Sequence, residues 1–569
     1  MRIAITGIGT VSAIGCNCTE TLQALLNEQS GIGTMRILGS CHTELPVGEV
    51  PYTDAELKAM LGIDAPMPRT ALLGIMAARE ALKMAGSCDT FINGTTVGGM
   101  DLTEQHWQDY QQGQAAEHIR LHEAGETTNV IAAHLSPFTH SPIRPFTLST
   151  ACSSALNAIM LGANLLRTGQ AKAVLAGGAE SLSKFHLNGF NTLMILDHQA
   201  CRPFDAERAG LNLGEGAGYL VLEREEDAVA RNAAILGYIG GYANTCDAFH
   251  QTASSEQGEG AFLAMQGALR MAGLAPSDID YINAHGTATP NNDLSESAAL
   301  KRLFGNHMPA VSSTKAFTGH TTSASGGLEA AICVIAMQHG FIPANLNWSQ
   351  TAEGLILPVT HTEHKRLRHI VCNAFGFGGN ESSLVISAEG IDLPEAPLAD
   401  MTVVTEMEVS DDTETAAYVS SAEARRMTPQ MRRIVAAARK ALMETGITPD
   451  AILCATRWGC MAQSMRFLQD MIESEEQQLK PTPFIQSTHN TVASLIAILT
   501  GNHGYNATYS QGEQSLSCAL TDVRTQMSLG LIRTALILEF DEQVDAWDKV
   551  LQLINEHTEN IARASIYTL

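Results

Sequence analysis

Long apolar runs, CxxC cysteine pairs and an excess of basic residues are all missing from this chain of 569 residues. No stretch of about 18 consecutive apolar residues occurs, so no membrane span is expected. The first residues, MRIAITGIGTVSAIG, contain no uninterrupted apolar core followed by a small-residue cleavage site, so no signal peptide is predicted. The net charge of −25 argues against nucleic-acid binding, which needs clustered Lys and Arg side chains.

The twelve cysteines are scattered along the chain and form no CxxC pair. The two closest, Cys16 and Cys18, have no histidine cluster beside them that would complete a zinc-binding pattern. We therefore predict no metal site. We expect most of the thiols to be buried, in a protein of the reducing cytoplasm.

The length predicts two or three domains, because one hydrophobic core rarely serves so many residues. Hydrophobic residues make up 45% of the chain and charged residues 17%, which is typical of a globular protein. Apolar strand-like runs alternate with Ala-rich helix-like runs, and this alternation predicts an α/β fold with largely parallel strands. The strand-like runs are residues 2–9, 95–100, 173–180, 217–223, 281–286, 370–379 and 383–387.

A repeated segment indicates internal duplication. AREALKMAG (78–86), MQGALRMAG (265–273) and ARKALMETG (438–446) each read as a helix that ends at a glycine. Glycine is favoured at that position because it adopts the left-handed conformation at little cost. Each copy is followed by a short polar stretch and an apolar strand, so the chain is predicted to contain three related half-domains.

The third copy continues to match the first at an offset of 361 residues, as VGGM (97–100) and WGCM (458–461) show. At this offset Thr147 aligns with Thr508 and Cys152 with Glu513. The third copy therefore aligns with the first without a gap but lacks the thiol. The acidic, proline-bearing segment 389–401 lies between the copies and is predicted to be a linker.

The stretch PFTLSTACSSALNAI (145–159) places Cys152 between a strand-like and a helix-like run. A thiol attacks as thiolate, and the positive end of a helix lowers its pKa, so Cys152 is a candidate nucleophile. Its backbone N–H is also placed to face a developing oxyanion. A lone cysteine among Ser and Ala is more often part of the core, and these residues alone leave that alternative open.

Three further segments carry polar residues in small-residue loops after strand-like runs. NAHGTATPNND (283–293) contains His285, and SSTKAFTGHTTSASGGLEAA (312–331) contains Lys315 and His320. The third, NAFGFGGNESS (373–383), is a glycine-rich turn with two phenylalanines. A thiol, two imidazoles and an ammonium in such loops favour one shared site over separate structural roles.

Together these segments resemble the signatures of the elongating β-ketoacyl-ACP synthases, the Cys-His-His condensing enzymes of the thiolase superfamily. ACSSA, AHGTATPNND, KAFTGHTTSASGGLEA and NAFGFGGNES agree with that family in order, spacing and identity, over about residues 1–388. Two small departures are AT in place of ST after HGT, and GGNES where a threonine usually follows GG. The resemblance implies a thiolase-like five-layer αβαβα fold of two duplicated halves, followed by an extra C-terminal half-unit.

The resemblance also implies a division of the chain. Residues 1–230 would form the N-terminal half with the nucleophile, and residues 231–388 the C-terminal half with the two histidines. After the linker at 389–401, residues 402–569 resemble a degenerate N-terminal half, similar to a fragment of a chain-length factor. We expect this segment to dock on the synthase body, on a dimer mate or on another subunit. A packing role is favoured over a role in shaping the site.

The family's chemistry carries over to matching residues. Cys152 would hold an acyl chain as a thioester, while His285 and His320 would bind the thioester carbonyl of malonyl-ACP and stabilise its enolate. Lys315 would support His320.

Five more positions match the family's site. Glu329 would join the lysine network, with a helix-surface carboxylate as the alternative. The N–H of Phe377 would complete the oxyanion hole with that of Cys152. Thr287 and Thr289 would bind the phosphopantetheine arm, and Phe375 either contacts substrate or only packs.

The implied function is a 3-oxoacyl-[acyl-carrier-protein] synthase, which performs a decarboxylative Claisen condensation in fatty acid or polyketide/polyene biosynthesis. Acyl-ACP and malonyl-ACP would be its partners. It would need no cofactor of its own because phosphopantetheine arrives on the carrier protein, and a homodimer is expected. One alternative is a degradative thiolase, disfavoured because phenylalanine stands in the turn where thiolases place a second cysteine. The other is a non-catalytic chain-length partner subunit, disfavoured by the intact cysteine and histidines.

Overall fold

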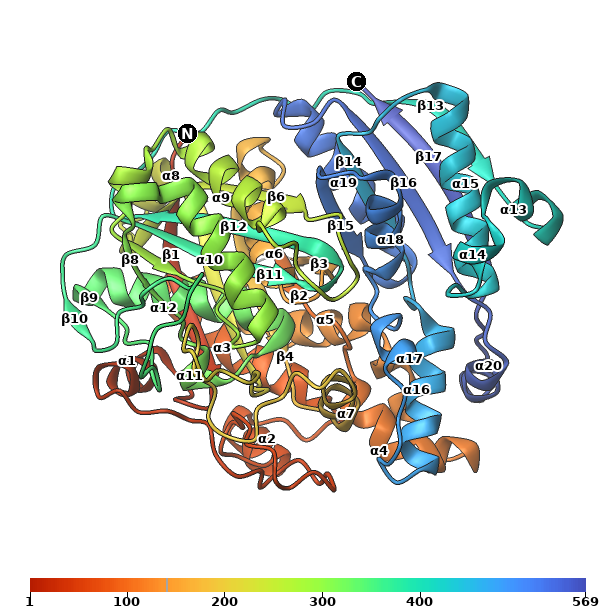
Figure 1. Cartoon of the computed structure of the whole chain (residues 1–569), viewed down its shortest axis with the longest axis horizontal. Helices are drawn as coiled ribbons and strands as arrows, with labels where there is room; N and C mark the ends of the chain where they lie inside the picture. Colours follow the sequence, from red (N-terminus) through yellow and green to blue (C-terminus); the bar gives the residue numbers. More distant parts are fainter. Residues whose placement is uncertain (140–141) are drawn as a thin grey trace.

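Fifteen strands join into one mixed sheet in the computed structural model, which describes residues 1–139 and 142–569 (Figure 1). The strands fall into three groups of five along this sheet. The first group has the order β3 (Arg144–Leu148), β2 (Thr90–Gly94), β4 (Ala173–Glu180), β5 (Gly216–Arg224) and β1 (Ile3–Ser12). The second has the order β6 (Gly237–Cys246), β12 (Asn380–Ser387), β11 (His369–Gly376), β7 (Tyr281–Asn283) and β8 (Ala310–Ser312).

Helices separate and cover these first two groups. α3 (Arg69–Ala85) covers the outer face of the first group, and α9 (Glu259–Ala272) with α10 (Pro290–Phe304) covers the second. Between them lie α6 (Ser154–Arg167) and α12 (Ser325–His339). Both inner helices are buried all round rather than along one stripe, because a sheet lies on each side of them. The result is the predicted five-layer thiolase-like arrangement.

The third group of strands repeats the order of the first. It runs β15 (Tyr505–Tyr509), β14 (Ala451–Ala455), β16 (Thr534–Asp541), β17 (Ile561–Thr568) and β13 (Thr402–Glu408). The strands β14, β15 and β16 and the helix α19 (Ser515–Ser528) begin 361 residues after β2, β3, β4 and α6. The glycines that follow α6 and α19 both have left-handed φ angles, 71° at Gly169 and 68° at Gly530. The offset read from the sequence is therefore a structural repeat.

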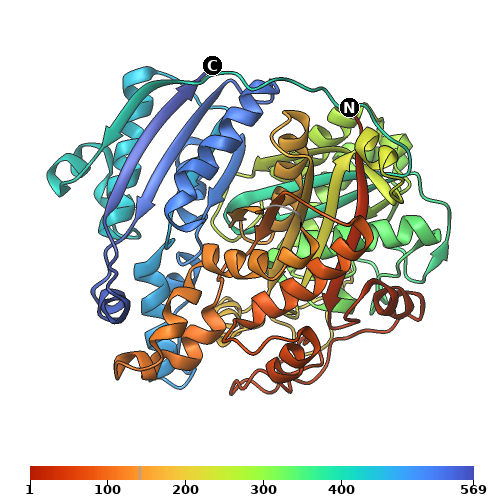
Figure 2. The ribbon, with the colours of Figure 1, turned by 180° about the vertical axis from the view of Figure 1, so that it is seen from behind.

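The repeat packs against the rest of its own chain, and we call residues 402–569 the module and residues 1–388 the body. The edge strands β15 and β3 meet antiparallel at Tyr509 and Leu148. The N–H of Ser149 donates to the carbonyl of Thr508 at 2.9 Å, and that of Ser510 to the carbonyl of Thr147 at 3.1 Å. The two donors, Ser149 and Ser510, are 361 residues apart, and so are the two acceptors, Thr147 and Thr508. Each bond is therefore the equivalent of the other with body and module exchanged, and the two parts are joined about a local pseudo-twofold axis. Figure 2 shows the two parts side by side, connected by an irregular segment between β12 and β13.

The three repeated helices end as predicted. α3 stops at Gly86, α9 at Gly273 and α15 (Pro429–Thr445) at Gly446, with φ angles of 92°, 66° and 64°. The strand predicted at 95–100 is wrong, because the chain turns after β2 through Gly98 (φ 54°) and α4 begins at Met100. That turn is held by the carboxylate of Glu180, which accepts from the Thr95 hydroxyl.

The remaining elements complete the fold, and one of them, α11 (Lys315–Thr318), is buried throughout. No helix among the described residues is both long and apolar enough to span a membrane. Two short strands, β9 (Phe341–Ile342) and β10 (Glu363–His364), form a separate sheet. The other α-helices are α1 (Cys18–Leu26), α2 (Asp54–Leu61), α4 (Met100–Gln111), α5 (Ala124–Ala133), α7 (Lys184–Thr192), α8 (Glu225–Ala230), α11 (Lys315–Thr318), α13 (Asp412–Tyr418), α14 (Ser421–Ala424), α16 (Met461–Glu473), α17 (Pro481–Ile485), α18 (Thr491–Thr500) and α20 (Asp545–Leu551).

Candidate active site

Cys152 lies in the turn that joins β3 to α6. Ala151, directly before it, has a positive φ of 52°, a conformation that costs energy for any residue with a side chain. The glycine-rich turn after β11 approaches Cys152 closely, since a Cβ on Gly376 would lie 3.0 Å from the Cys152 backbone nitrogen. The cysteine side chain is only 6% exposed. Strain in one turn and a glycine in the other thus hold the thiol in a tight, buried position.

Burial dominates the electrostatics of the Cys152 thiol. Loss of water raises its pKa to about 12, although the Lys315 charge and the backbone N–H groups of Phe377 and Cys152 itself act to lower it. The lowered pKa predicted from the helix N-terminus is therefore wrong. α6 begins two residues later, at Ser154, and desolvation of the buried thiol is the largest contribution to its pKa. These two N–H groups are those of the predicted oxyanion hole, which stays a prediction.

Two histidines lie beside this thiol. Nε2 of His320 is 3.1 Å from Sγ of Cys152, and the His285 ring meets that of His320 edge-on at 5.3 Å between centroids. Each histidine is 2% exposed. Burial first, and the nearby Lys315 charge second, hold the pKa of both imidazoles well below the ordinary value, so both are neutral. Neutral imidazoles can donate a hydrogen bond without bringing a charge into the site.

Backbone contacts fix where these histidines stand. The N–H groups of His285 and Gly286 donate to the carboxylate of Glu296 on α10, at 2.9 and 2.8 Å. The N–H of His320 donates to the carbonyl of Asn212 at 2.7 Å. Residues from separate layers of the fold therefore converge on one thiol.

Lys315 and Glu329 form an ion pair in the layer beneath. Nζ of Lys315 is 2.5 Å from Oε1 of Glu329, and the two side chains are 1% and 3% exposed. Glu329 is thus no helix-surface carboxylate, and the alternative interpretation of it is wrong. Burial raises its pKa while the lysine charge opposes that rise.

The other predicted residues line an open cavity that includes Cys152 and both histidines. Thr287 and Thr289 hydrogen-bond each other there at 2.9 Å between hydroxyl oxygens. The Phe375 ring lies 5.7 Å from the His285 ring, so it contacts the site and also packs. The Phe377 ring stacks on that of Phe190 at 5.5 Å. All nine predicted site residues are therefore gathered around or directly beneath one thiol.

A second cavity also includes Cys152, and the module forms part of its wall. Trp458, Phe484 and His489 of the module line it together with Phe190 of the body. α16 and α17 of the module pack on α7 of the body in the same region (Figure 1). The module is therefore more than a packing unit, because it contributes side chains to the cavity that contains Cys152.

Sequence reasoning missed the residues of this second cavity. They carry no motif, and they come from segments about 300 residues apart, so only the fold brings them together. It also missed Glu381, a buried carboxyl that lines the open cavity and whose Oε2 has no hydrogen-bond partner among the described residues. Glu381 lies in the segment GGNES (378–382), which departs from the family's usual sequence, and this departure could have identified it.

The pKa of Cys152 leads to a testable expectation. Iodoacetamide should alkylate Cys152 slowly at neutral pH, and the rate should rise about tenfold per pH unit from about pH 7 to about pH 10, because only the thiolate reacts. Peptide-resolved mass spectrometry measures this rate separately from that of the exposed Cys41. A plateau below about pH 8 would show instead that the site stabilises the thiolate.

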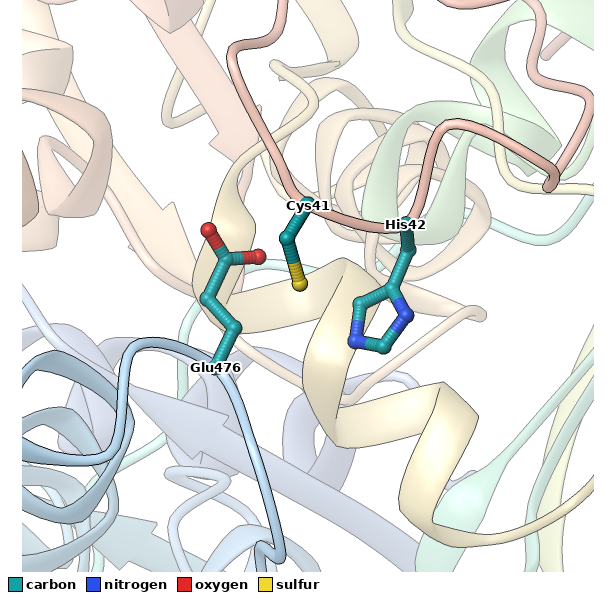
Figure 3. A group of neighbouring side chains, drawn as sticks. All are labelled: Cys41, His42 and Glu476. Carbon is teal, nitrogen blue, oxygen red and sulfur yellow. The ribbon is translucent and has the colours of Figure 1, made fainter.

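Outside this site, Cys41, His42 and Glu476 bring three possible metal-binding atoms within 4.8 Å of one another (Figure 3). The Glu476 carboxylate already accepts hydrogen bonds from Ser40 at 2.5 Å and Asn188 at 2.9 Å. It also lies 3.4 Å from the ammonium of a nearby lysine. These contacts explain the cluster as part of the interface between body and module.

Comparison with known proteins agrees with this geometry. Residues 1–228 and 236–349 match the family models of the beta-ketoacyl synthase N-terminal and C-terminal domains, and residues 402–562 match a second N-terminal domain model. The 3-oxoacyl-[acyl-carrier-protein] synthase 2 of Vibrio cholerae is 33% identical over 406 residues, covering 68% of this chain and 98% of that protein.

Two solved structures extend the comparison. The ishigamide ketosynthase/chain length factor is 30% identical with a TM-score of 0.63, over 68% of this chain and 99% of its own. The PfaC keto synthase–chain length factor covers all of this chain and 78% of its own at a TM-score of 0.78, and at 18% identity it shows likeness of fold alone. By its sequence, by its fold and by the residues gathered at Cys152, this chain belongs to the beta-ketoacyl synthase family.

Proposed function

We propose that this chain is a 3-oxoacyl-[acyl-carrier-protein] synthase. It would join an acyl group held on Cys152 to malonyl-ACP with loss of CO₂, in fatty acid or polyketide/polyene biosynthesis. The observation that carries the proposal is the 3.1 Å contact between Sγ of Cys152 and Nε2 of His320, with His285 beside it. A nucleophile and two neutral imidazoles in a dry site suit chemistry that forms an oxyanion and an enolate.

In the first half-reaction Cys152 takes the acyl group from its carrier. Sγ attacks the thioester carbonyl, and the oxyanion that forms accepts from the backbone N–H groups of Cys152 and Phe377. The thiol proton passes to the departing pantetheine sulfur, with Nε2 of His320 within reach to relay it. A new C–S bond thus replaces the old one, and the carrier leaves as a free thiol.

In the second half-reaction malonyl-ACP takes the place of the acyl carrier. His285 and His320 would donate hydrogen bonds to its thioester carbonyl, and loss of CO₂ would leave an enolate on that oxygen. Burial, and the Lys315 charge after it, keep both imidazoles unprotonated. The same positive charge favours the negative charge on the enolate oxygen. The enolate carbon then attacks the Cys152 thioester, whose C–S bond breaks as the new C–C bond forms. The β-ketoacyl product leaves, and the Cys152 thiolate takes up a proton from water to restore the thiol.

The open cavity supports a place for the carrier's arm. Thr287 and Thr289 line it together with Cys152, and we propose that their hydroxyls bind the phosphopantetheine amides. The arm would come with acyl-ACP or malonyl-ACP, so the reaction needs no cofactor held by this chain.

The substitution His285→Ala tests the second half-reaction. Removing one oxyanion donor should lower the rate of CO₂ release from labelled malonyl-ACP by about 10²–10³-fold. Acylation of Cys152, seen by intact-protein mass spectrometry, should continue because His285 does not contact the sulfur. Unchanged CO₂ release would contradict the role proposed for this histidine.

We also propose the domain limits 1–230, 231–388 and 402–569, with 389–401 as the linker. The homodimer that the family resemblance predicts stays a prediction. The edge of β3 is already paired with β15 of the same chain. A second copy would therefore have to bind at another face.

A further inference from the structure

The second cavity has an aromatic part beside Cys152. The Phe190 ring lies 5.5 Å from that of Phe377 and 5.5 Å from that of Phe484. An acyl chain on Cys152 that entered this cavity would pass between these rings. The module side of the cavity differs, because polar side chains from both parts of the protein gather there.

The hydroxyl groups on the module side are already satisfied. The Ser464 hydroxyl donates to the carbonyl of Cys460 at 3.2 Å, and that of Ser487 to the carbonyl of Phe484 at 2.8 Å. The Thr488 hydroxyl pairs with that of a neighbouring threonine at 2.9 Å. Each of these hydroxyl groups therefore has a hydrogen-bond partner within the protein and needs none from a ligand.

Two imidazoles on the same side are not satisfied. Nδ1 of His489 is buried without a partner, and neither of its ring nitrogens bonds to a described residue. Nδ1 of His122 bonds to the Thr103 hydroxyl at 2.9 Å, which leaves its Nε2 free. Burial lowers the pKa of His489 to about 4 and that of His122 to about 3, so each ring is neutral, with one donor and one acceptor nitrogen.

The His489 ring occupies a space that the backbone leaves for it. A Cβ at Gly459 would lie 1.8 Å from Cδ2 of His489, so only glycine fits there. Gly459 has a φ of 70°, which also favours glycine. Both histidines line the second cavity, His122 from the body and His489 from the module.

The charged groups on this side favour one class of ligand. The Arg457 guanidinium binds the Glu123 carboxylate at 3.0 and 2.7 Å and that of Glu556 at 2.6 Å. Glu556 is also paired with the Arg120 guanidinium at 2.5 Å, and both Glu123 and Arg457 line the cavity. Two cations and two carboxylates are thus paired with one another, which leaves no unpaired charge for a charged ligand group and favours a neutral one.

We propose that His489 and His122 bind a neutral hydroxyl group at the distal end of the acyl chain carried on Cys152. The module thereby selects hydroxylated acyl groups over plain alkyl chains. The inference rests on the proposed function, because it specifies which acyl group the nucleophile accepts. A hydroxyl both donates and accepts, so it can bond at once to Nε2 of His122 and to a ring nitrogen of His489, one acting as acceptor and the other as donor.

A matched pair of substrates tests this selection. The full chain is incubated with ω-hydroxyacyl-ACP or with alkyl-acyl-ACP of equal chain length, over a series of lengths, and intact-protein mass spectrometry follows acylation. At the length that fits best, the hydroxylated chain should acylate Cys152 roughly 10- to 100-fold faster, because an alkyl end leaves buried imidazoles unpaired. Equal rates at every length would overturn the proposal.

Three variants locate the selection. His489→Leu should reduce the preference to about threefold or less, while His489→Gln, which keeps a donor and an acceptor, should retain most of it. His557→Leu is the matched control, because His557 is exposed and lies outside this cavity. A preference that survives in His489→Leu would contradict the assignment of this residue.

The outcomes separate the two proposals. If wild type accepts acyl groups on Cys152 without distinguishing the pair, the inference fails and the proposed function stands. If no acyl-ACP modifies Cys152 at all, the proposed function fails first. Because wild-type discrimination is measured without any substitution, the test does not depend on variants that might misfold.

Discussion

Cys152→Ala should lose β-ketoacyl product formation by on the order of 10⁴-fold or more, since no other group can hold the acyl chain as a thioester. The variant should also show no added acyl mass after incubation with acyl-ACP. Release of CO₂ from malonyl-ACP should persist, because His285 and His320 remain in place. Product formation and CO₂ release are followed together with labelled malonyl-ACP and an acyl-ACP primer.

The matched control for this experiment is Cys41→Ala, which removes an exposed thiol that lines neither cavity at Cys152. It should keep wild-type rates. Residual condensation in Cys152→Ala would show that another group is the nucleophile. A wild-type protein that neither condenses nor becomes acylated with any primer would favour the non-catalytic partner subunit instead.

Lys315→Met should lower the free energy of unfolding by about 3–5 kcal/mol, because it leaves the Glu329 carboxylate buried without its partner. The cost should fall at low pH, where Glu329 takes up a proton. The double variant Lys315→Met/Glu329→Leu should recover most of the loss, since it removes both buried charges. Chemical denaturation of wild type and of both variants measures the difference. Equal stability of the single and double variants would show that the pair is not coupled.

The same substitution has a consequence for pH dependence. The Lys315 charge helps to depress the pKa of His285 and His320, so its removal should raise both values. The imidazoles would then take up protons at a higher pH than in wild type. The acid limb of CO₂ release should therefore shift to higher pH in Lys315→Met, whereas a purely structural effect would lower the rate without moving the limb.

Much of the site could be predicted because its residues lie in short sequence segments, each with a recognisable pattern of strand, small-residue loop and helix. Cys152 follows a strand and precedes a helix, and His285 follows another strand, so sequence order alone indicated loops at strand ends. The ionisation of the thiol could not be predicted in this way. Its pKa depends on how completely the surrounding layers exclude water, and that is a property of packing.

The sequence by itself determined the α/β class, the repeat at an offset of 361 residues and the nine candidate residues, because periodicity, glycine positions and short motifs are local properties of a chain. Only the tertiary structure decided where the module docks and what it contributes. Pairing of β15 with β3 brings Trp458 and His489 to the cavity of Cys152, across about 300 residues of chain. No local sequence pattern predicts such a contact, because it forms between surfaces of the body and the module that are far apart in the chain.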